Sequence, residues 1–74
     1  MSEHRLPATL VNVISRQEGL VSRRQLLASG VSDEFARARV LAGRWQHVHR
    51  GVYATFNGPL GRTAQIWAAL LRAG

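Results

Sequence analysis

Residues 22–43 read SRRQLLASGVSDEFARARVLAG, and this stretch decides the fold. Ser22 is followed three residues later by Gln25, which is the spacing of a capping box at the start of a helix. The pattern predicts a short helix that begins at about Arg23. Gly30 is typical of a residue that stops such a helix.

The second half of the stretch predicts another helix. Ser32 can cap a helix over residues 33–42, and the two acidic residues of its first turn are favoured beside the positive end of the helix dipole. Gly43 ends it. Two short helices joined by a turn of about three residues predict a helix-turn-helix, with the axes at roughly 90 to 120°.

The faces of the 33–42 helix can be assigned at about 100° per residue. Ala36 and Val40 form the expected buried seam, with Phe35 beside them. Arg37 and Arg39 fall on opposite flanks of this seam. The exposed centre offers few hydrogen-bonding groups for reading base edges, since it consists of Glu34, Ala38 and Leu41.

Upstream, residues 6–18 predict a helix that tolerates Pro7 in its first turn and stops at Gly19. Its apolar stripe at helical spacing is Leu6, Leu10, Val13 and Ile14. The apolar pair at residues 20–21 favours a brief strand that pairs elsewhere.

Downstream, the β-prone runs 45–48 and 52–56 are separated by His49, Arg50 and Gly51, which predicts a hairpin. A hairpin directly after a helix-turn-helix is a wing. The predicted fold class is therefore mainly α: a winged helix-turn-helix of three to four helices with a small antiparallel β-hairpin wing.

The last segment follows a cluster of Asn, Gly and Pro breakers and predicts a helix over 62–73. We interpret residues 1–5 as a flexible N-terminus, 6–56 as the winged helix-turn-helix domain, and 57–74 as a linker and C-terminal helix leading to a domain absent from this chain. The helix carries apolar residues on more than one face, namely Ile66, Trp67, Leu70 and Leu71.

Composition limits the function classes. The chain has 74 residues, 46% of them hydrophobic, and no cysteine, so one small domain held by packing is expected. The ten basic residues are all arginine and face four acidic ones, for a net charge of +6, which indicates a polyanionic partner. Neither a membrane span nor a signal peptide is recognisable, and we expect a cytoplasmic, nucleoid-associated protein without a membrane partner.

Enzyme and metal sites find little support in the residues. His47 and His49 share a face of an extended strand and could offer two imidazoles to zinc or nickel, but a site needs further ligands, and the third histidine is the terminal His4. No carboxylate pair, phosphate loop or nucleophile motif is present. We expect no catalytic residue, no metal and no cofactor, and interpret Trp45 and Trp67 as core or interface anchors.

Six arginines are the candidate DNA-binding residues, each with the alternative of a solvated surface position. Two open the first helix of the helix-turn-helix and suit phosphates, three lie on the second helix and its exit, and one at the wing tip suits a narrow minor groove. They are Arg23, Arg24, Arg37, Arg39, Arg44 and Arg50.

The run 19–55, GLVSRRQLLASGVSDEFARARVLAGRWQHVHRGVYAT, resembles the N-terminal winged-helix domain of the AbiEi family of type IV antitoxins, including actinobacterial proteins in which it precedes a further domain. The most specific parts are VSRRQLLASGVS, AGRW and HRGVYAT, and the likeness covers about residues 8–74. Two positions depart from the family pattern. Ala36 replaces a bulkier aliphatic residue, with Phe35 filling the space, and Leu41 occupies a position that is often basic.

The resemblance implies a module that binds double-stranded DNA and represses its own toxin–antitoxin operon at inverted repeats in the promoter. It implies that neutralisation of a nucleotidyltransferase toxin depends on a missing C-terminal domain. By position, it carries the family's basic residues over to Arg23, Arg24, Arg37, Arg39 and Arg50. No reaction is predicted.

Two other functions remain open. One is a protein-interaction or homodimerisation module whose contact face is the last helix, with Trp67 and Leu71. The other is the targeting module of a fused endonuclease of the very-short-patch-repair type.

Overall fold

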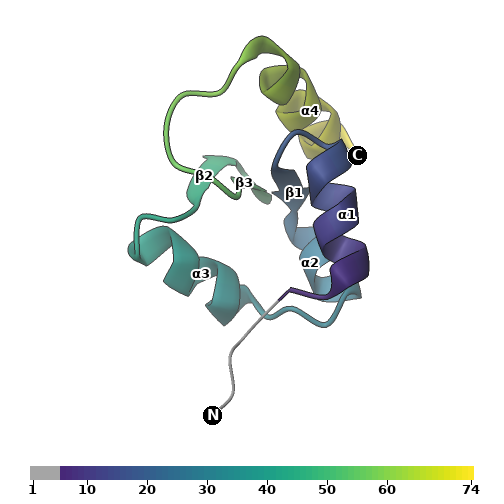
Figure 1. The fold of residues 1–74 in the computed structure, drawn as a ribbon, viewed down its shortest axis with the longest axis vertical. Coiled ribbons are helices and arrows are strands. Elements are labelled where there is room, and N and C mark those ends of the chain that lie inside the picture. The colour runs from purple at the N-terminus through teal and green to yellow at the C-terminus, as the bar shows by residue number, and fades with distance from the viewer. Residues whose placement is uncertain (1–5) are drawn as a thin grey trace.

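The computed structural model describes residues 6–74, so the expected flexibility of residues 1–5 lies outside the described residues (Figure 1). The order of elements is that of a winged helix, as predicted. They are α1 (Ala8–Arg16), β1 (Leu20–Ser22), α2 (Arg23–Ala28), α3 (Asp33–Leu41), β2 (Gln46–His49), β3 (Val52–Ala54) and α4 (Arg62–Ala73). No helix within residues 6–74 has the length and apolar character that crossing a membrane requires.

A small antiparallel sheet lies at the centre of the molecule, with strand order β1-β3-β2 (Figure 1). The brief strand predicted at residues 20–21 is β1, and its partner is β3: Leu20 pairs with Ala54 and Ser22 with Val52. Because this register is antiparallel, the end of β1 lies beside the start of β3. The beginning of α2 and the tip of the wing are thereby brought to the same end of the sheet.

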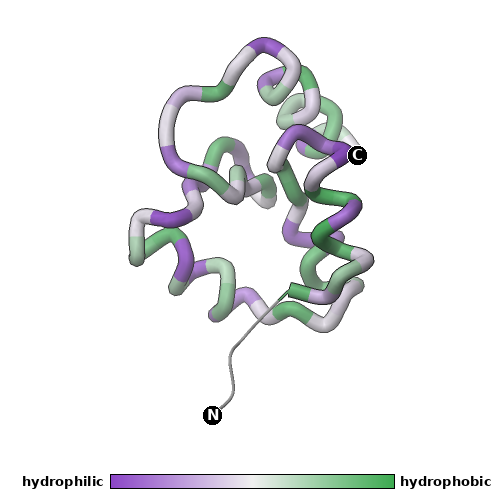
Figure 2. The backbone as a smooth tube through the Cα atoms, viewed as in Figure 1, coloured by the Kyte–Doolittle hydropathy of each residue, from purple (hydrophilic) through white to green (hydrophobic). Residues whose placement is uncertain are grey.

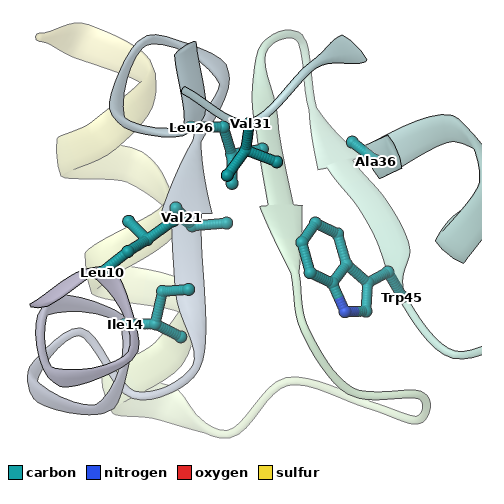
Figure 3. Close-up of a cluster of buried hydrophobic side chains, with 7 residues drawn as sticks. All are labelled: Leu10, Ile14, Val21, Leu26, Val31, Ala36 and Trp45. Carbon is teal, nitrogen blue, oxygen red and sulfur yellow. The ribbon is translucent and has the colours of Figure 1, made fainter. Parts of the chain in front are cut away.

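One core cluster packs α1, α2 and α3 against the sheet. Val21 of β1 is fully buried and Trp45, just before β2, is 7% exposed, which confirms Trp45 as a core anchor. Phe35 packs against the same cluster beside the fully buried Ala36, as predicted. The buried members, drawn in Figure 3, are Leu10, Ile14, Val21, Leu26, Val31, Ala36 and Trp45.

A second cluster lies between α4 and the sheet. Leu20, Val52 and Ala54 face the small residues Ala64 and Ala68 of α4, all of them buried. Small side chains let the helix approach the strands closely. The helix predicted over 62–73 is confirmed, and it shares its core with the sheet.

The expectation that Trp67 and Leu71 form an exposed contact face is wrong. Both are partly buried and pack against the second cluster. The exposed apolar residues of α4 are Ile66, at 54%, and Leu70, at 57%. The physical reason is the rotation of α4, which its two buried alanines fix by facing the sheet.

The helix-turn-helix is capped as predicted. The Ser22 hydroxyl accepts from the Gln25 amide at 3.0 Å, and the Gln25 side chain accepts from the Ser22 amide at 3.0 Å. The Ser32 hydroxyl accepts from the Phe35 amide at 3.2 Å and caps α3. The sequence reasoning missed the buried Gln17, whose amide exchanges hydrogen bonds of 3.1 and 2.9 Å with Gln25 and so joins the end of α1 to α2.

The wing turns at Arg50 and Gly51, and Gly51 has φ +72°, a left-handed conformation that suits glycine. β2 is shifted by one residue from the predicted 45–48, and β3 is shorter than the predicted 52–56. His49 belongs to β2 instead of the turn. The side chain of Gln46, in β2, donates to the carbonyls of Phe56 and Gly58, which follow β3. These two hydrogen bonds hold the segment after β3 against the wing.

The first helix is also shorter than the predicted 6–18. Pro7 is its N-cap and Gln17 its C-cap. Glu18 and Gly19 then both take positive φ values, +59° and +86°. Two consecutive left-handed residues turn the chain sharply into β1, which ends the helix earlier than a single glycine stop would.

Candidate nucleic-acid interface

Arg23 lies at the junction of the two helices of the helix-turn-helix. It opens α2, and its guanidinium forms a bidentate ion pair with Asp33, which opens α3: Nε to Oδ1 and Nη2 to Oδ2 are both 2.8 Å. The hydrogen bonds from Arg23 lower the pKa of Asp33, and the same contact raises the pKa of Arg23. The two side chains are 54% and 37% exposed, so the pair lies at the surface.

The wing turn joins this junction through the backbone. The Arg23 amide donates to the Gly51 carbonyl at 2.8 Å. Together with the ion pair to Asp33, this bond places the start of α2, the start of α3 and the wing turn next to one another. Arg50, at the tip of the wing, is exposed beside them.

The exposed face of α3 has the composition that the sequence predicted. Leu41 is 81% exposed, and Arg37 is also exposed. Hydrophilic and hydrophobic segments alternate along α3 (Figure 2). Base edges in a groove would therefore meet an arginine, the exposed carboxylate of Glu34, and small or apolar side chains on this helix.

Arg39 and Arg44, the two other arginines near α3, do not share the position of Arg37 on the exposed face of the helix. The Arg39 guanidinium lies over the Phe35 ring, 4.8 Å from its centroid, so this side chain covers the apolar flank of the helix. Arg44 is exposed in the segment after α3, where its amide donates to the Arg39 carbonyl at 3.0 Å.

A groove brings three of the candidate arginines together with one that the sequence analysis did not name. It runs between the start of α2, the wing turn and the end of α4, with a volume of about 860 Å³. The residues that define this arginine groove are Arg23, Arg24, Leu27, Arg50, Leu71 and Arg72. Arg37, Arg39 and Arg44 do not line it. Arg72 was missed because its place in the same groove as Arg50 depends on how α4 packs, which sequence spacing does not reveal.

Both histidines of the wing are exposed, and the pairing of β2 with β3 shifts register between them. A β-bulge lies between them: His47 pairs with Tyr53 and His49 with Val52, neighbours whose side chains point to opposite faces of β3. His47 stacks on Tyr53, with ring centroids 5.0 Å apart. Across residues 6–74, no group of three or more His, Cys, Asp or Glu side chains is placed to hold a metal ion.

Comparison with known proteins assigns the chain to a family. No curated protein and no solved structure matches the chain. A family model described as "Transcriptional regulator, AbiEi antitoxin" matches residues 9–55, from α1 to the residue after β3. The match covers most of the chain, including the whole helix-turn-helix and its wing. The protein therefore belongs to the AbiEi antitoxin family of transcriptional regulators.

Proposed function

We propose that this winged helix binds double-stranded DNA and represses transcription of its own toxin–antitoxin operon. In this proposal α3 enters the major groove, the start of α2 contacts the backbone and the wing lies along the adjacent minor groove. Membership in a family of antitoxin regulators and the net charge of +6 support it.

The observation that carries the proposal is the junction at Arg23. Its ion pair with Asp33 and its backbone bond to Gly51 hold the start of α2, the start of α3 and the wing turn together. These are the parts of a winged helix that meet DNA. Since an arginine side chain has five N–H donors and the ion pair uses two, Arg23 retains donors for a phosphate.

The roles of the remaining arginines follow from their positions. Arg37 is the arginine of α3 that can reach a base edge or phosphate from the exposed face. Arg24 and Arg50 line the same groove as Arg23 and suit phosphate contacts. Arg39 and Arg44 act as backbone contacts at the edge of α3, with Arg39 limited by its packing on Phe35.

Fluorescence anisotropy would test the proposal with two duplexes, the promoter upstream of the protein's own gene and a scrambled sequence, each over a salt series. We expect tighter binding to the promoter and a fall in affinity as salt rises, because phosphate contacts release counterions. Arg37→Ala and Arg50→Ala should each lower the slope of log affinity against log salt by about 1. Absence of binding even at low salt would show that the proposal is wrong.

Repression needs a separate readout. A reporter driven by the same promoter should be repressed by the wild-type protein and released by Arg37→Ala. A matched control is Arg62→Ala, which removes the same charge from the start of α4, away from the junction. Equal release by both variants would mean that net charge, not the junction surface, accounts for the effect.

A second candidate function, homodimerisation through α4, rests on a different observation. Ile66 and Leu70 lie one helical turn apart and are each more than half exposed. Sedimentation of the wild type and of an Ile66→Gln, Leu70→Gln double variant would decide it. A wild-type dimer that the double variant converts to a monomer would support this function, and a wild-type monomer at all concentrations would exclude it.

A further inference from the structure

Arg72 lies in the last turn of α4, outside both the helix-turn-helix and the wing. The packing of α4 against the sheet nevertheless brings it to the arginine groove, which Arg23, Arg24 and Arg50 also line. Four arginines from three separate parts of the chain thus line one open groove. No Asp or Glu side chain is among the described residues that line it.

The walls of the groove are fixed by hydrogen bonds. The Arg23 amide donates to the Gly51 carbonyl at 2.8 Å, which ties α2 to the wing turn. On the other side, Nη1 of Arg24 donates to the Gly74 carbonyl at 2.9 Å, which ties α2 to the end of α4. Leu27, Leu70 and Leu71 supply the apolar part of the lining. These two contacts link the three elements that line the groove.

The arginine side chains that line the groove favour a chain of phosphate groups as the ligand. Arginine side chains form forked hydrogen bonds to phosphate oxygens, and a duplex carries one phosphate charge per roughly 1.7 Å of its axis. The groove also shares Arg23 and Arg50 with the surface proposed to meet DNA. A backbone that passes the wing turn therefore continues into the groove.

We propose that the arginine groove is a binding site for a DNA backbone segment and that Arg72 is a DNA-contacting residue. This inference rests on the proposed DNA-binding function and extends the contact surface to α4. An acidic segment of a protein partner is the alternative occupant. The duplex is favoured because the groove is continuous with the Arg23 junction.

The test compares Arg72→Gln with Arg62→Gln in the chain of residues 1–74. Both variants remove one charge from an exposed position of α4, but only Arg72 lines the groove. Binding to the scrambled duplex is measured by anisotropy over a salt series, because a phosphate contact does not depend on sequence. Arg72→Gln should lower the salt slope by about 1 and weaken binding roughly three- to tenfold at low salt. Arg62→Gln should change neither, and Arg72→Lys should keep the wild-type slope.

The outcomes separate this inference from the proposed function. If the wild type binds, Arg37→Ala weakens binding, and Arg72→Gln behaves like Arg62→Gln, the groove is not a DNA site and the proposed function stands. If the wild type binds no duplex, both are wrong. A labelled polyglutamate peptide tests the alternative occupant. If Arg72→Gln weakens binding of the peptide but leaves duplex binding unchanged, the groove binds an acidic protein segment and the inference is wrong.

Discussion

At the scale of single residues, the ion pair between Arg23 and Asp33 combines two roles that the sequence suggested separately. Asp33 was expected to stabilise the start of α3 through the helix dipole, and Arg23 to contact phosphate. The structure joins them in a bidentate contact. Asp33 thereby orients the guanidinium at the junction of α2, α3 and the wing while contributing to the stability of the turn.

This ion pair gives stability a dependence on pH whose sign can be worked out. The pKa of Asp33 is lowered in the folded state, mainly by its hydrogen bonds to Arg23. Its contribution is therefore present above the ordinary aspartate pKa and is lost as the pH falls through the lowered value. We expect Asp33→Asn to melt at a lower temperature than the wild type near neutral pH, and the difference to vanish in acid.

Glu34→Gln is the matched control for this prediction. It removes a charge from the same first turn of α3 and leaves the ion pair intact. Thermal melting of both variants across the acid range would show whether the pair matters. Equal losses at neutral pH would leave only the helix dipole as the source of stability.

At the scale of elements, the sequence was sufficient for the helix starts that a capping residue or a breaker cluster defines. The caps Ser22 and Ser32 and the start of α4 lie where they were expected. The predicted bounds of α1 were too wide at both ends, and other differences arose where the decisive contact is distant in sequence. The exposed face of α4 depends on its packing against β1 and β3, and the bulge between His47 and His49 depends on pairing with β3.

The candidate site also has features that the sequence could predict and features that it could not. Each of the six arginines can be placed on a helix, its exit or the wing from sequence alone. The bidentate pair with Asp33, the cover of Phe35 by Arg39 and the approach of Arg72 to the wing cannot, because they require the angles between elements. Periodicity assigns a residue to a face, but it does not show which other element that face meets.

Two turns that connect elements should respond differently to the same substitution. Gly51 and Gly19 both have positive φ, +72° and +86°, so alanine at either is strained by about 1–2 kcal/mol. A Cβ at Gly51 would meet open space, whereas at Gly19 it would lie 2.9 Å from the ring of Phe56. We expect Gly19→Ala to lower the free energy of unfolding more than Gly51→Ala does.

Urea unfolding of the two variants would measure this difference. A Gly51→Asn variant serves as the control for backbone strain, because asparagine tolerates left-handed backbone and should lose less stability than alanine. If Gly19→Ala and Gly51→Ala were equally stable, the Phe56 ring would have to move aside without cost. The close packing of the linker on the turn before β1 would then contribute nothing to stability.

At the scale of the whole molecule, the sheet has a hydrophobic core on each face, and α4 supplies one of them. Leu20, Val52 and Ala54 are at most 1% exposed, and their cover comes from α4. This packing bears on the domain boundary that the sequence predicts after residue 56. A domain of residues 6–56 alone would expose that face of the sheet to water. A fully buried Leu or Val side chain contributes about 1.5–3 kcal/mol, a large fraction of the stability of a small domain.

We therefore expect a chain that ends at Gly61, just before α4, to lose its cooperative melting transition. The matched control is the Ile66→Gln, Leu70→Gln double variant, which changes only the exposed side of α4 and should melt close to the wild type. Circular dichroism over a temperature ramp would compare the three chains. A truncated chain that melts as cooperatively as the wild type would mean that one core is enough and that α4 belongs to a separate unit. Loss of the transition in the truncated chain alone would make α4 part of the DNA-binding domain, which is the condition for Arg72 to occupy a fixed place beside the wing.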